Sequence, residues 1–164
     1  QRMAGLFPGK GEAALAGYKA IHPDASPGDI LIRAMSDTTR FNGIELAEAH
    51  IKGGKGGTWQ YLFTWETPVL PYLKAAHGID GAFYFDRTEA IPIATGNPGA
   101  RLIGARASAA WASFARTGNP STRALAWPQY ALAGRETMIW DAPPRVESDP
   151  LQAERELRVR LAVA

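Results

Sequence analysis

The side chain best suited to chemistry in this sequence is the imidazole of His77, which is followed directly by Gly78. It comes after a strand-like aromatic run at 59–66, so we expect it on a loop beyond a buried strand, where a rigid scaffold can hold a reactive group. Imidazole exchanges protons near neutral pH, as a general base or acid must. A lone histidine is also commonly structural or solvated, and the neighbouring sequence has to decide between these interpretations.

The sequence contains no pattern typical of a metal-ion site or a phosphate-binding loop. His22, His50 and His77 lie far apart, with no carboxylate at helical spacing to join them in a metal site. The sequence has no cysteine, which excludes disulfides and thiolate ligands. It has neither a P-loop nor a G-x-G-x-x-G motif. We therefore expect no metal ion and no organic cofactor.

Composition narrows the class of protein. A chain of 164 residues, 46% of them hydrophobic, is long enough for one globular domain with a core. The net charge of only +2 argues against a nucleic-acid partner, and no apolar run is long enough for a membrane span. The first residue is not methionine and no signal-peptide pattern follows, so we expect the chain to begin inside a larger protein, and the compartment stays open.

Hydrophobic spacing and helix-capping residues indicate the elements that would position His77. We expect helices at 11–21, from Pro27 onward, at 42–52, at 100–117 and from 151 to about 162, and strands at 59–66 and 136–141. The helix at 100–117 should bury a stripe of five side chains: Ile103, Ala107, Ala110, Trp111 and Phe114. The first strand carries aromatic residues at alternate positions, which we interpret as cover for a core rather than as a substrate pocket.

Several short motifs, in order, resemble one known family. They are Asp37 with Phe41, Tyr61-Leu62-Phe63, His77-Gly78 followed by Phe83-Tyr84-Phe85, W-x-x-F-A-x-T-G-x-P at 111–120, and W-P-x-Y at 127–130. The last two are specific, whereas His-Gly alone is not. Over residues 18–141 the chain resembles the C-terminal third of the type B carboxylesterases, the serine esterases related to cholinesterases and bacterial p-nitrobenzyl esterases.

The resemblance implies an α/β fold, namely the C-terminal part of an α/β-hydrolase with a mixed, mostly parallel sheet flanked by helices. The triad of that fold runs serine, acid, histidine along the chain, and His77 resembles its histidine. No serine here lies in a G-x-S-x-G motif. We therefore expect residues 1–164 to be the C-terminal portion of one catalytic domain, with the triad serine and acid on an upstream N-terminal portion of the same enzyme.

The same resemblance implies roles for Asp37 and for the two residues that follow His77-Gly78. Asp37 resembles the family's aspartate in D-x-x-x-F, which implies support behind the histidine and serine loops; the alternatives are an N-cap for a helix starting at Thr38, or the triad acid. After the histidine the family usually has two polar or acidic residues, where this chain has Ile79 and Asp80. We expect Ile79 to make the rim of the pocket apolar and Asp80 to cap or steer the loop.

The function implied is hydrolysis of small carboxylic esters through an acyl-enzyme, with this chain supplying the catalytic histidine and inactive by itself. The alternative is a non-catalytic relative used for binding or adhesion. The serine upstream of residue 1 would decide between them.

Overall fold

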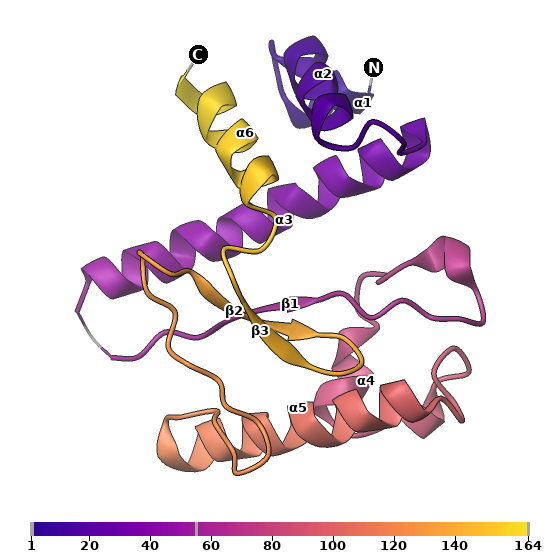
Figure 1. Ribbon diagram of the computed structural model, residues 1–164, viewed down its shortest axis with the longest axis vertical. Helices are drawn as coiled ribbons and strands as arrows, with labels where there is room; N and C mark the ends of the chain where they lie inside the picture. Colours follow the sequence, from indigo (N-terminus) through magenta and orange to yellow (C-terminus); the bar gives the residue numbers. More distant parts are fainter. Residues whose placement is uncertain (1, 55, 164) are drawn as a thin grey trace. The chain divides into compact units, whose positions relative to one another are not determined.

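The computed structural model describes residues 2–54 and 56–163, and they form two compact units. The first unit contains the residues up to Ala49 and those from Pro150 onward; the second is His50–Asp149. In chain order the elements are α1 (Arg2–Leu6), α2 (Gly11–Ile21), α3 (Pro27–Lys52), β1 (Gln60–Phe63), the 3-10 turn η1 (Pro71–Leu73), α4 (Asp80–Tyr84), η2 (Thr88–Ala90), α5 (Pro98–Thr117), β2 (Glu136–Trp140), β3 (Arg145–Ser148) and α6 (Gln152–Val163) (Figure 1).

The long helix α3 is continuous, so the prediction of a separate helix at 42–52 is wrong. A polar run, Ser36-Asp37-Thr38-Thr39, suggested a break, yet the chain stays helical through it. The hydroxyl of Thr38 donates to the carbonyl of Ala34 one turn earlier, so it does not compete with the helical hydrogen bonds. One face of the helix is also buried at helical spacing on both sides of the run: Ile30, Ala34, Asp37, Phe41 and Ile44.

Two other helices of the first unit, α2 and α6, match their predicted positions to within a residue or two, whereas α1 was not predicted. They pack against each other, and the approach is close at Gly17, where an added Cβ would collide with the side chain of Leu157. The core of this unit combines Phe7, Tyr18, Ile30 and Leu157. Packing of apolar faces therefore joins the two ends of the sequence within one unit.

The second unit contains a small mixed sheet in the order β1-β2-β3, with β1 parallel and β3 antiparallel to β2. Both predicted strands exist. The first is shorter than predicted because the chain leaves the ladder after Phe63, where the N–H groups of Thr64 and Trp65 both point at the carbonyl of Trp140. The polar sequence of β3 gave no strand signal, and that strand was not predicted.

Helix α5 covers one face of this sheet (Figure 1). Its N-cap is Asn97, whose side chain accepts from the N–H of Ala100, and Gly118 ends it in the left-handed region. Its buried stripe is mostly as predicted. Phe114 is the exception: it is 49% exposed, and its ring lies edge-on to Trp59, so that part of the prediction is wrong.

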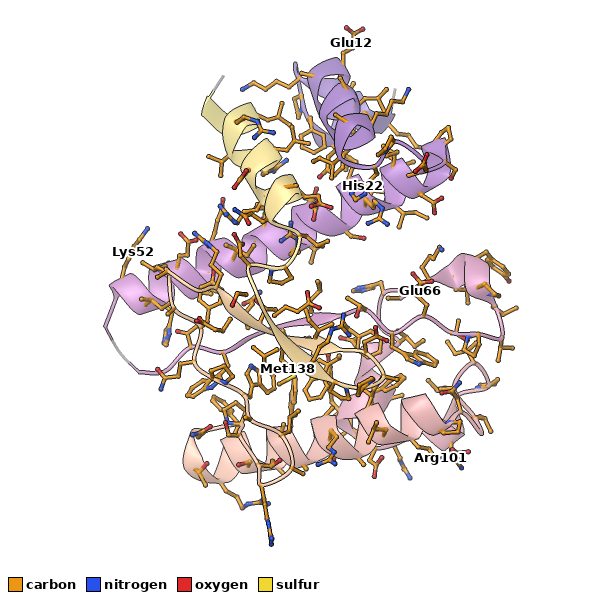
Figure 2. All side chains as sticks on the ribbon, viewed as in Figure 1. Glu12, His22, Lys52, Glu66, Arg101 and Met138 are labelled. Carbon is orange, nitrogen blue, oxygen red and sulfur yellow. The ribbon has the colours of Figure 1, made fainter. Side chains whose placement is uncertain are left out.

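Side chains fill the space between the sheet, where Met138 is labelled, and α5 (Figure 2). We call this set the aromatic core. Its buried members are Trp65, Ile79, Phe83, Ala94, Ala100, Ile103, Ala107, Ala110, Trp127, Met138 and Trp140. Trp59 and Phe63 pack against it, which agrees with the prediction that the aromatic strand serves as core cover.

Candidate active-site histidine and the elements that hold it

His77 lies in an exposed turn between η1 and α4 in the second unit. Within residues 2–54 and 56–163, no group forms a hydrogen bond or ion pair with its imidazole. Both ring nitrogens are therefore free for chemistry. A general base also needs a partner that orients it, and that partner is not among the residues described.

The turn itself is closed by backbone geometry. The N–H of Ile79 donates to the carbonyl of Ala76 at 3.3 Å, which encloses His77 and Gly78 in a four-residue turn. Gly78 has φ +83°, a conformation in which a residue with a Cβ would be strained. The His-Gly pair is therefore a local requirement, because the residue after the histidine must adopt the left-handed conformation for the chain to enter α4.

Ile79 is buried, at 8% exposed, and belongs to the aromatic core. The expectation that it lines the rim of a pocket is therefore wrong. The next buried residue of α4 is Phe83, whose ring lies edge-on to Phe63 at 4.9 Å and tilted against Trp65 at 5.2 Å. Ile79 is buried because α4 packs against the aromatic strand, and burial of an apolar side chain is favoured by the hydrophobic effect.

Asp80 begins α4, where a carboxylate suits the positive end of the helix dipole. The hydroxyl of Tyr84 donates to its Oδ2 at 3.1 Å. The Tyr84 ring stacks on Trp111 of α5, with centroids 4.2 Å apart and planes 13° apart. Burial, followed by the neighbouring Tyr61 phenol and Asp80, raises the pKa of Tyr84 well above its ordinary value, so it stays a neutral donor. Asp80 therefore holds Tyr84 within α4, and the Tyr84 ring links α4 to Trp111 of α5.

Asp37 lies in the first unit, near the middle of α3, and is 4% exposed. The alternative that it caps a helix starting at Thr38 is wrong, because the helix begins at Pro27, ten residues before Asp37. The Tyr18 hydroxyl donates to one carboxylate oxygen at 2.7 Å and Arg40 Nε donates to the other at 2.8 Å. Both partners belong to the first unit, and the proposed support of the catalytic loops stays a prediction.

Arg40 extends this network to the start of α6. Its Nη1 and Nη2 atoms donate to the carbonyls of Pro150 and Leu151 at 3.2 and 3.3 Å. Burial, together with the hydrogen bond to Asp37, raises the pKa of Tyr18 above its ordinary value, so the phenol remains a donor. Asp37 thus connects α2, α3 and the segment leading into α6.

Asp37→Asn should lower both stability and, to a smaller degree than His77→Ala, activity. Asparagine keeps the size of the side chain but loses the charge that pairs with Arg40, and a hydrogen bond to a charged group contributes about 1.5–3 kcal/mol. Thermal unfolding of the complete protein would show the loss, with the exposed Asp24→Asn as the control that leaves it unchanged. Equal activity losses from Asp37→Asn and His77→Ala, without a change in stability, would instead identify Asp37 as the triad acid.

The two remaining histidines have structural partners. His22, labelled in Figure 2, places Nε2 2.7 Å from Oε1 of Glu154, which is buried. His50 lies in the last turn of α3, as predicted, and its Nδ1 lies 2.7 Å from Oγ1 of Thr58. Sequence reasoning missed the His22–Glu154 pair because the two residues come from opposite ends of the chain.

Among residues 2–54 and 56–163, no three or more His, Cys, Asp or Glu side chains form a cluster that could hold a metal ion. No helix in this part of the chain is both long and apolar enough to span a membrane.

Comparison with known proteins places this geometry among esterases. No family model matches the sequence. The para-nitrobenzyl esterase of Bacillus subtilis (strain 168) is 37% identical over 101 residues, which is 60% of this chain and 21% of that protein. The structure of the Geobacillus stearothermophilus carboxylesterase EST55 matches with a TM-score of 0.74 at 31% identity, over 89% of this chain and 31% of that one.

Two other solved esterases agree with these matches. A thermophilic PNB esterase has a TM-score of 0.70 at 29% identity, over 94% of this chain and 32% of its own. An esterase from Clostridium hathewayi, at 24% identity and a TM-score of 0.60, supports the fold alone. The chain thus spans about a fifth of the curated relative and about a third of the solved structures. These matches confirm the resemblance inferred from the motifs: the chain is similar to part of the para-nitrobenzyl esterases and carboxylesterases of the α/β-hydrolase fold, consistent with a C-terminal portion of a type B carboxylesterase.

Proposed function

We propose that this chain is the C-terminal portion of a serine carboxylesterase and that His77 is the histidine of its catalytic triad. The observation that carries the proposal is the state of His77: an exposed imidazole without a partner among the described residues, on a turn anchored to a packed core. Histidines with a purely structural role are normally paired, as His22 and His50 are here. Esterase relatives at 37% and 31% identity support the class of reaction.

The proposed chemistry needs a serine, an acid and an oxyanion hole from the remainder of the enzyme. His77 accepts the proton of the serine hydroxyl as Oγ attacks the ester carbonyl carbon. It then gives that proton to the departing alcohol oxygen, which leaves an acyl-enzyme. In the second half His77 takes a proton from water, the resulting hydroxide attacks the acyl carbon, and the proton returns to serine Oγ as the carboxylic acid departs.

The division of the triad follows from the same proposal. Residues 1–164 form the C-terminal portion of one catalytic domain, and the serine and acid lie on the N-terminal portion of the same enzyme. Two features support this: no serine of the chain lies in G-x-S-x-G, and the chain spans 31% of the carboxylesterase that it resembles in structure. The substrate is a small carboxylic ester, and the residues described here call for no metal or organic cofactor in the reaction written above.

The complete enzyme should release p-nitrophenol from p-nitrophenyl acetate in a burst followed by a slower steady rate, because acylation and deacylation are separate steps. Stopped-flow absorbance of the released p-nitrophenol measures both phases. A complete protein that binds esters but never turns them over would instead be a binding or adhesion relative.

A further inference from the structure

We propose that Ile79 is a positioning residue for His77, an inference that rests on the function proposed above. The side chain of Ile79 is buried in the aromatic core, while His77, two residues earlier, is exposed. The turn at 76–79 therefore connects the exposed His77 to the buried side chain of Ile79. In this arrangement Ile79 touches no substrate; it acts by holding the backbone that carries the imidazole.

The backbone before His77 offers much weaker support. Every residue from 68 to 78 is at least partly exposed, so the nearest buried side chain on that side is Thr67, ten residues away. Tyr72, in η1, is 72% exposed. The ion pair between Lys74 and Glu66 is long, at 3.6 Å, and both side chains are exposed, so it contributes little.

The turn cannot hold the imidazole by itself. Gly78 has no side chain and is the most permissive residue in the backbone, and a single hydrogen bond of 3.3 Å, from Ile79 to Ala76, closes the turn. The position of His77 is consequently set from its C-terminal side, by the insertion of Ile79 and then Phe83 into the aromatic core. This chain uses an apolar side chain for that purpose directly after His-Gly.

Truncating the Ile79 side chain should slow the chemical step. A displacement of about 1 Å in a catalytic group can lower the rate about a hundredfold. We therefore expect Ile79→Ala in the complete enzyme to lower kcat for p-nitrophenyl acetate by about 10- to 100-fold, with KM changed less than twofold. Ile79→Val, which keeps most of the buried side chain, should restore at least a third of the wild-type kcat.

The matched control is Ile103→Ala. Ile103 is fully buried in the same aromatic core but comes from α5, not from the His77 turn. Both alanine variants remove the same atoms from the same core and should lower the melting temperature. When kcat is measured well below both melting temperatures, only Ile79→Ala should show the loss. Any effect of a less well packed core is common to both variants, whereas only Ile79 is connected to the His77 turn.

Each outcome has a defined meaning. Equal kcat values in Ile79→Ala and Ile103→Ala would overturn the inference, as would a loss confined to KM. If Ile79→Ala does not fold, the comparison is made with Ile79→Val, which should keep about a third to two thirds of the wild-type kcat, and Ile103→Val, which should keep all of it; equal kcat values in that pair would overturn the inference too. Failure of the proposed function is recognised separately, by a His77→Ala variant that keeps its activity.

Discussion

His77→Ala in the complete enzyme should reduce kcat for ester hydrolysis by several orders of magnitude. The reaction has no other route in this chain for moving the serine proton to the leaving alcohol, and loss of a triad member leaves only the contribution of binding and the oxyanion hole. The fold should be unaffected, because the side chain is exposed and unpaired among the described residues. Steady-state kinetics and thermal unfolding of the same preparation would measure both effects.

The control for this substitution is His50→Ala. That imidazole is also exposed and in the second unit, but Nδ1 already bonds Thr58 Oγ1, so its removal should leave kcat within about twofold of wild type. A His77→Ala enzyme that kept a tenth of the wild-type activity would rule out the assignment. Loss of activity together with loss of the folded state would be resolved by His77→Gln, which keeps polarity without a general base.

Residues 1–164 produced alone should neither form a stable soluble monomer nor hydrolyse p-nitrophenyl esters. In the part of the chain that the structure describes, the parallel strand β1 has only one neighbour, and an open strand edge leaves N–H and C=O groups unpaired. Val69, Tyr72 and Phe85 are also largely exposed. Apolar surface left in water costs about 25 cal/mol per Å². A few hundred Å² therefore amounts to several kcal/mol, against a typical net stability of about 5–15 kcal/mol.

Gel filtration, thermal unfolding and an ester assay on this fragment provide the measurement. Co-expression with the N-terminal portion is the informative comparison, because recovery of solubility and turnover only in its presence would support a divided catalytic domain. A soluble monomer with a sharp unfolding transition would refute the claim that the chain is an incomplete unit. Turnover by that monomer would further show that the nucleophile lies within residues 1–164.

The sequence by itself determined those elements whose signals are local. Helix α5 was predictable because Asn97-Pro98 starts it and Gly118 stops it, each acting through bonds within one turn. The same holds for α2, whose apolar spacing and following His22-Pro23 suffice. The family resemblance was also carried by contiguous motifs, and the comparisons confirm it. The sequence also predicted that His77 lies on a loop after the aromatic strand, whereas the exposure of that turn came from the structure.

Only the tertiary structure decided the environment of Asp37 and of Ile79. A helix cap was one alternative for Asp37, yet Tyr18 and Arg40 compensate its burial within a continuous helix. Ile79 looked like a pocket rim, yet the aromatic core receives it. Caps and periodicity depend on residues within a turn or two, whereas the cost of burying a charge or the gain from burying an isoleucine depends on side chains brought in from distant parts of the chain.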